Sequence, residues 1–237
     1  MAVLDDTASS LADRARVRQL AGWSGIGMVV AILINGPVSI AVGRMPSYWT
    51  ADAADRLSRY LSDDGNITKS IAFFALSNLI FVFALGFFSG LRRLGAEADA
   101  SGWVAGVVTI GAALFLAGGL VSEILSTGLP VVLRSTPGYT FEVNDALLLQ
   151  GLWMTALAQA QVALGTLITV LCVATLRTRL LPAWLCWLGI VAGIVAILRP
   201  ALVTEIPIFI ATFQPVLLWI AAVSVVLIRQ AGVIRHQ

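Results

Sequence analysis

Six long apolar runs, separated by shorter polar segments, dominate the chain. Each has roughly the length at which a helix, rising about 1.5 Å per residue, crosses the ~30 Å hydrocarbon core of a membrane. None shows the alternating pattern of barrel strands about ten residues long. The runs are Leu20–Val42, Ile67–Gly90, Gly102–Leu129, Ala146–Leu176, Leu181–Leu198 and Ile208–Ile228. We therefore predict an all-α, polytopic membrane helix bundle of about six transmembrane helices.

Composition supports a lipid environment. The 237 residues are 59% hydrophobic and 12% charged, whereas soluble domains are about half apolar and about a quarter charged. Arginine greatly outnumbers lysine, which occurs only as Lys69. Together with abundant Ala, Val and Gly, this bias is typical of a GC-rich bacterial genome. We expect a multi-pass protein of the bacterial cytoplasmic (inner) membrane.

The distribution of arginine predicts the orientation. With six spans, both termini fall on one side, and that side collects the arginines of the tails and of two short turns. They are Arg14, Arg16, Arg18, Arg92, Arg93, Arg177, Arg179, Arg229 and Arg235. By the positive-inside rule this side is cytoplasmic. The predicted organisation is a cytoplasmic tail over residues 1–19, a transmembrane domain over 20–228 and a second cytoplasmic tail over 229–237.

The longest external loop contains a helical pattern of its own. Its apolar positions are Trp49, Ala53, Leu57, Tyr60 and Leu61. Their spacing predicts a short external amphipathic helix at about 49–61, ended by the polar residues 64–66. The helix either lies on the outer membrane surface, with Trp49 and Tyr60 at headgroup depth, or forms a lid over an external pocket.

Charged side chains near the membrane are the candidates for function, because burying a charge is costly without a partner or a role. Glu123 lies 21 residues after Gly102, roughly 32 Å along a helix and thus near the outer boundary. The candidate ligand-binding residues are Glu123, Arg134, Arg199, Glu205 and Trp49. The charged members could form a static salt-bridge set between helix ends, a shallow outward-facing polar pocket, or a site for ions or protons.

Polar residues inside the runs are mainly amides and hydroxyls, which are expected to hydrogen-bond between helices. Gln159 and Gln161 are two residues apart and therefore cannot share one face of a helix.

Glycine pairs flank the turn between the second and third runs. Gly86 and Gly90 precede this turn, and Gly102 and Gly106 follow it. Such small-xxx-small patterns let helix backbones approach closely. They predict close packing of the second run against the third.

The apolar runs lack the residues that several kinds of enzyme site require. The only histidine, His236, is next to the C-terminus, so no imidazole within the runs could ligate haem or zinc, or activate Ser24 of a Gly-x-Ser-Gly sequence. Cys172 and Cys186 lie in separate apolar runs and form no CxxC pair. We expect no catalytic residues, no metal, no cofactor and no nucleic-acid partner.

The entry into the fifth run is distinctive. It reads Leu181-Pro182-Ala183-Trp184-Leu185-Cys186-Trp187-Leu188-Gly189. This step resembles the Leu-Pro-x-Trp-Leu-x-Trp-Leu-Gly stretch of small bacterial multi-pass membrane proteins that share a domain of unknown function. The resemblance extends to chain length and span layout. It implies a polytopic membrane fold and supplies no functional residue.

Two functions remain open from the sequence. The first is a non-catalytic membrane protein that serves as an accessory or assembly partner, with the lipid bilayer around it and another membrane protein or a second copy as its partner. The second is a small-molecule binder or transporter with an outward-facing polar vestibule around Glu123, Arg199 and Glu205. The two hypotheses differ in whether these side chains surround an open cavity.

Overall fold

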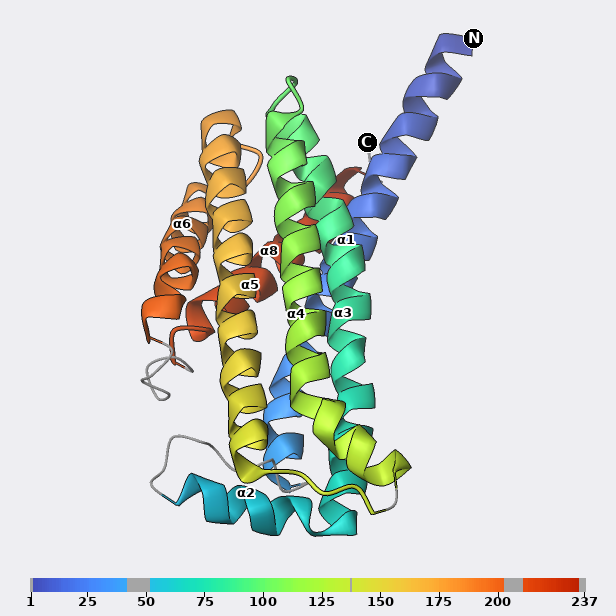
Figure 1. Ribbon diagram of the computed structural model, residues 1–237. Helices are drawn as coiled ribbons and strands as arrows, with labels where there is room; N and C mark the ends of the chain where they lie inside the picture. The colour runs from blue at the N-terminus through green and yellow to red at the C-terminus, as the bar shows by residue number, and fades with distance from the viewer. Residues whose placement is uncertain (1, 42–51, 137, 203–210, 235–237) are drawn as a thin grey trace.

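The computed structural model describes residues 2–41, 52–136, 138–202 and 211–234, and within these residues the secondary structure is helical (Figure 1). In chain order the elements are α1 (Ala2–Ala41), α2 (Ala53–Leu61), α3 (Asp64–Ala98), α4 (Trp103–Ser135), α5 (Val143–Thr178), α6 (Ala183–Leu198), the 3-10 turn η1 (Arg199–Leu202) and α8 (Gln214–Ile234). The predicted all-α class is confirmed. The predicted N-terminal tail is itself helical, because α1 begins at Ala2 and continues into the first span.

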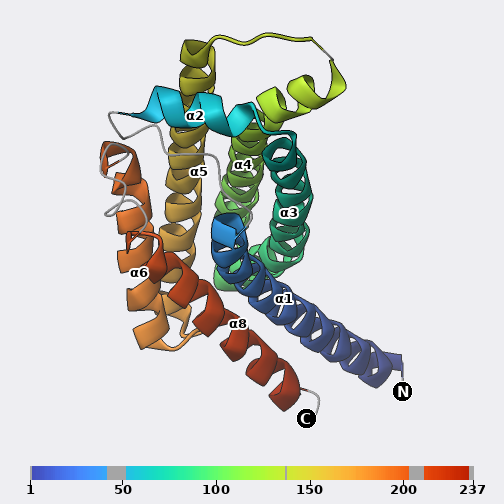
Figure 2. The same cartoon turned by 90° about the horizontal axis from the view of Figure 1, so that it is seen from below.

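Six helices in the described chain are long and apolar enough to cross a membrane. They include most of α1 and all of α3, α4, α5 and α8, and the sixth extends from Ala183 to Ala201. Both termini lie at one end of the bundle, whereas α2 lies across the opposite end (Figures 1 and 2). We call these the terminal end and the α2 end. The six-span prediction, with both termini on one side, agrees with this arrangement.

The spanning helices differ in length. The helices α3, α4 and α5 contain 35, 33 and 36 residues, which at ~1.5 Å per residue makes each roughly 50 Å long. The helix α6 has only 16 residues, close to the minimum for a ~30 Å hydrocarbon core. Figure 1 shows α6 and the start of α8 stopping well short of α2, while α3, α4 and α5 reach it. The α2 end is therefore built mainly by these three helices and the end of α1, without α6 and α8.

The short helix α2 packs on protein. Leu57, Tyr60 and Leu61 are buried and form an apolar cluster with Ala146 at the start of α5. Tyr60 is 8% exposed, and its hydroxyl lies 2.7 Å from Ser70 Oγ. The amphipathic helix is confirmed, but the placement of Tyr60 among lipid headgroups is wrong, because α3 and α5 bury this ring.

The predicted end of α2 is confirmed, but the residues that follow it have another role than predicted. The helix stops at Leu61, and Asp63 then caps α3 by accepting a 2.7 Å hydrogen bond from the Gly65 backbone N–H. The polar residues 64–66, predicted to end the amphipathic helix, instead form the first turn of α3. An Asp in this position favours a helix start because its carboxylate satisfies a free N–H group.

Small residues set the distances between helices. A Cβ atom added to Gly165 of α5 would lie 2.4 Å from the carbonyl oxygen of Gly193 on α6, and one added to Gly25 of α1 would lie 2.0 Å from Ser224 Oγ on α8. Real Cβ atoms do not approach other atoms this closely. Since lipid supplies no hydrophobic drive between helices, this close contact is the main source of their cohesion.

The glycines around the α3–α4 turn pack differently from the prediction. Gly86 and Gly90 lie against Ser24 and Ala21 of α1, while Gly106 faces open space. The second and third spans do pack against each other, as predicted, but these glycines do not form that contact. Their spacing permits a close approach, but it does not specify which helix approaches.

The α3–α4 turn is held by Asp99. Its carboxylate accepts hydrogen bonds of 2.6 Å from Ser101 Oγ, 3.1 Å from the Ser101 N–H and 3.3 Å from the Val104 N–H at the start of α4. These donors, the Ser101 hydroxyl foremost, favour the charged form and lower the pKa of Asp99. The side chain fixes the turn and satisfies a free N–H of the next helix.

Packing at Gly165 predicts a site-specific loss of stability. Replacing Gly165 with Ala should cost about 1–3 kcal/mol of unfolding free energy, because the new methyl group meets the Gly193 backbone. Gly151→Ala on the same helix is the matched control, since a Cβ there meets nothing within 4 Å. Thermal or denaturant unfolding of purified protein measures both. Equal stabilities of the two variants would contradict the packing described.

The burial of Tyr60 predicts a pH dependence. Burial raises the pKa of this phenol above its ordinary value, against the opposing effect of the Ser70 hydrogen bond. Because the folded state favours the neutral phenol, its contribution to stability is complete below about pH 10 and is lost as the pH rises through the higher folded pKa. Tyr60→Phe should remove a tyrosinate absorbance step above about pH 10, which spectrophotometric titration of the purified protein measures.

Candidate functional site

The predicted outer residues do not form one cluster in the described chain. Arg134 is exposed in the last turn of α4 and makes no ion pair with a described residue. Glu123 is half-buried 11 residues earlier on the same helix, roughly 16 Å away along its axis. Trp49 and Glu205 lie outside the described residues. The proposed meeting of Arg134 with Glu123 at one level is therefore wrong.

Arg199 is the most deeply buried of the candidate residues that the structure describes. It starts η1, is 3% exposed, and places its guanidinium carbon 5.1 Å from the ring centroid of Phe213. A cation held over an aromatic ring is stabilised by the ring quadrupole, and more strongly where water is excluded. A role in holding the end of α6 against the segment leading into α8 fits this geometry.

The helix α5 stands between Glu123 and Arg199. It packs extensively against α4 on one side and against α6 and η1 on the other, and Figure 2 shows α4, α5 and α6 in that order. The sequence predicts one depth for the outer charges, but it contains no direct information on which helices are neighbours.

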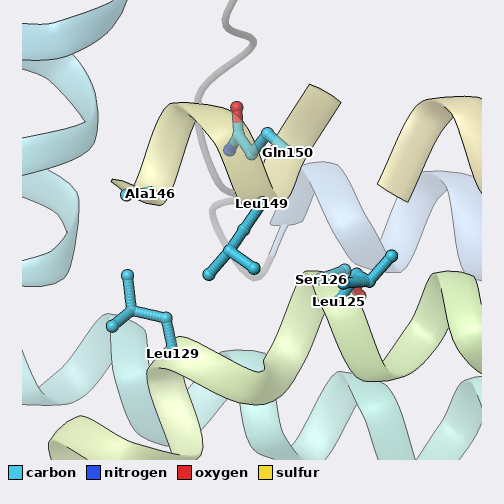
Figure 3. A pocket seen from close by; sticks show the side chains of 6 residues that line it. All are labelled: Leu125, Ser126, Leu129, Ala146, Leu149 and Gln150. Carbon is cyan, nitrogen blue, oxygen red and sulfur yellow. The ribbon is translucent and has the colours of Figure 1, made fainter. Parts of the chain in front are cut away.

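The pocket between α4 and α5 near the α2 end is very small. Figure 3 shows its lining, which is three leucines, one alanine, one hydroxyl and one amide: Leu125, Ser126, Leu129, Ala146, Leu149 and Gln150. Its volume is about 10 Å³, enough for about one water molecule. A substrate vestibule in this position would require these helices to separate.

A polar network at the terminal end was not anticipated from the sequence. Arg18 of α1 forms an ion pair with Glu97 of α3, and its second guanidinium nitrogen donates a 3.2 Å hydrogen bond to Gln230 Oε1 of α8. The Gln230 amide in turn donates a 3.0 Å bond to the Leu180 carbonyl in the α5–α6 turn. Four segments distant in sequence are thereby joined.

A second ion pair strengthens the same end. Arg93 of α3 lies 2.8 Å from Asp13 of α1. These two side chains are 36% and 61% exposed, compared with 18% and 21% for Arg18 and Glu97. The Arg18 pair is therefore the better shielded from water and salt. The sequence contains a signal for these pairs, because acids and arginines lie within a few residues of one another in both segments.

Within the part of the chain that the structure describes, no group of three or more His, Cys, Asp or Glu side chains could hold a metal ion. Comparison with models of protein families, with curated proteins and with solved structures gives no match. The resemblance carried by residues 181–189 therefore stays a prediction.

The terminal-end network predicts measurable coupling between α1 and α3. In a double-mutant cycle, Arg18→Gln and Glu97→Gln should show a coupling energy of about 1 kcal/mol in unfolding free energy. The more exposed pair, Arg93 and Asp13, is the internal control and should couple by less than about 0.5 kcal/mol. Additive effects at Arg18 and Glu97 would refute the coupling.

Proposed function

We propose that this chain is a non-catalytic integral membrane protein that acts as an accessory or assembly partner within the bilayer. The observation that carries the proposal is a row of small residues on the face of α4 that points away from the bundle, which we call the α4 row. Thr109, Ala113 and Ala117 recur every four residues and are exposed along the span. Comparable small residues elsewhere, such as Gly165 and Gly193, are buried in helix contacts. The α4 row would permit the same close approach by another transmembrane helix.

An exposed amide on the neighbouring helix supports the same proposal. Gln159 lies in the α5 span with its side chain exposed, and it has no hydrogen-bond partner among the described residues. By contrast, the exposed Thr155 and Thr166 donate to backbone carbonyls of their own helix. An amide facing lipid gains by hydrogen-bonding across to a partner helix.

The distribution of arginine supports an orientation. The terminal end carries Arg14, Arg16, Arg18, Arg92, Arg93, Arg177, Arg179 and Arg229. We place this end in the cytoplasm by the positive-inside rule, in the inner membrane of a bacterium. The α2 end would then face outward.

The vestibule alternative has weaker support. The pocket at the α2 end between α4 and α5 holds about one water molecule, and Arg199 is covered by the bundle and by Phe213. Neither observation favours a small-molecule site.

A test of the accessory role compares two alanines. Affinity-tagged full-length protein, gently solubilised from native membranes, should co-purify with a membrane protein or a second copy of itself. Ala113→Leu places bulk on the α4 row and should lower the recovered partner about fivefold or more, because it prevents close approach of the helices. Ala75→Leu makes the same change at an exposed position of α3 and should leave recovery unchanged.

Two results would count against this proposal. Recovery of the tagged polypeptide alone would argue against a stable partner. Equal loss of the partner in both alanine variants would show that the α4 row is not the contact surface.

A further inference from the structure

An open hollow lies at the terminal end between the α5–α6 turn and the last turns of α8. Its volume is about 580 Å³, and it is widely open to the surroundings of the bundle. Much of its wall is apolar, formed by Leu176, Leu181, Pro182 and Ala183, and its polar lining includes Arg179 and Gln230. The site is distinct from the outer residues predicted from the sequence and from the α4 row.

The hollow has a fixed wall and a cation available for a ligand. Both ends of the Gln230 amide are already bonded, to Arg18 and to the Leu180 carbonyl, so this side chain holds the turn against α8. Arg179 is exposed and makes no ion pair with a described residue. Arg177 and Arg229, each adjacent in sequence to a lining residue, are likewise exposed and form no ion pair within the described chain. An anion is therefore the complementary ligand.

The level of the hollow relative to the membrane surface identifies the source of that anion. Trp184 and Trp187 lie in the first turns of α6, and each is 59% exposed. Exposed tryptophans at the ends of spans mark the level of the lipid headgroups. The membrane span formed by α6 begins at Ala183, which itself lines the hollow. A phosphate at Arg179 would thus sit at headgroup level, with apolar helix surface running from it into the bilayer.

We propose that this hollow binds the headgroup of an anionic phospholipid. Arg179 donates to the phosphate, while Leu176, Pro182 and Ala183 contact the glycerol and the first carbons of the acyl chains. Basic pockets between transmembrane helices are a known solution for such headgroups. The proposal depends on the six-span arrangement and not on the accessory role.

The test measures which lipids the purified full-length protein retains. Protein is incorporated into nanodiscs containing equimolar phosphatidylglycerol and phosphatidylcholine, then released and analysed by native mass spectrometry. We expect the wild type to retain phosphatidylglycerol preferentially. Arg179→Asn should lower this preference about fivefold. Asparagine suits the position because residue 179 has a positive φ of 56°, which asparagine tolerates better than most residues.

A second variant tests the shape of the site without changing its charge. Ala183→Phe fills the hollow at an exposed position and should also lower the preference. It decides the question if Arg179→Asn fails to fold. Arg14→Gln, which removes an exposed charge from α1 at the same end, should retain wild-type preference.

Three results would overturn the proposal. The first is an absence of lipid preference in the wild type. The second is an equal loss in Arg14→Gln, which would indicate only general attraction to the positive end. The third is complete displacement of phosphatidylglycerol by millimolar glycerol phosphate, which would assign the hollow to a free phosphate compound. Persistence of the lipid under glycerol phosphate supports a membrane source.

Discussion

Close contact between helix backbones is the interaction on which the bundle depends. Within hydrocarbon, a helix satisfies its own backbone hydrogen bonds, and neighbouring helices gain little from burying apolar side chains, because lipid is equally apolar. Cohesion must come from surfaces that fit. Gly165 against Gly193 brings the α5 and α6 backbones together, and Gly22 against the Ser224 carbonyl does the same for α1 and α8. The first and last spans are thus neighbours, although nearly the whole chain separates them.

The two ends of the bundle use their charges differently. At the terminal end, Arg18 connects α1, α3 and α8, and Gln230 extends the connection to the α5–α6 turn. At the α2 end, the described charges are dispersed: Arg134 is exposed, and Arg199 is buried under an aromatic ring on the far side of α5. At the terminal end, the arginines beside the hollow form no ion pair within the described chain.

The α4 row and the hollow at the terminal end are two separate candidate binding sites. The α4 row is a surface for protein contact within the bilayer, and the hollow is a site for the lipid that surrounds it. Gly165 and Arg18 make contacts within the bundle, whereas Ala113 and Arg179 are exposed on its surface.

The sequence by itself determined the six spans, the helical class, the shared side of the termini and the amphipathic character of α2. These features follow from the length of apolar runs and from helical periodicity, which are local properties. It also predicted that Gln159 and Gln161 face different ways, and the structure confirms this, with Gln159 exposed and Gln161 buried.

Only the tertiary structure decided which helices touch. It directed Gly86 and Gly90 to α1, buried Tyr60 against protein, placed α5 between Glu123 and Arg199, and brought Gln230 to the α5–α6 turn. The physical reason is that nearly every span is surrounded by similar small and aliphatic residues, so composition does not distinguish a lipid-facing side from a helix-facing side. That choice depends on the fit of the whole bundle.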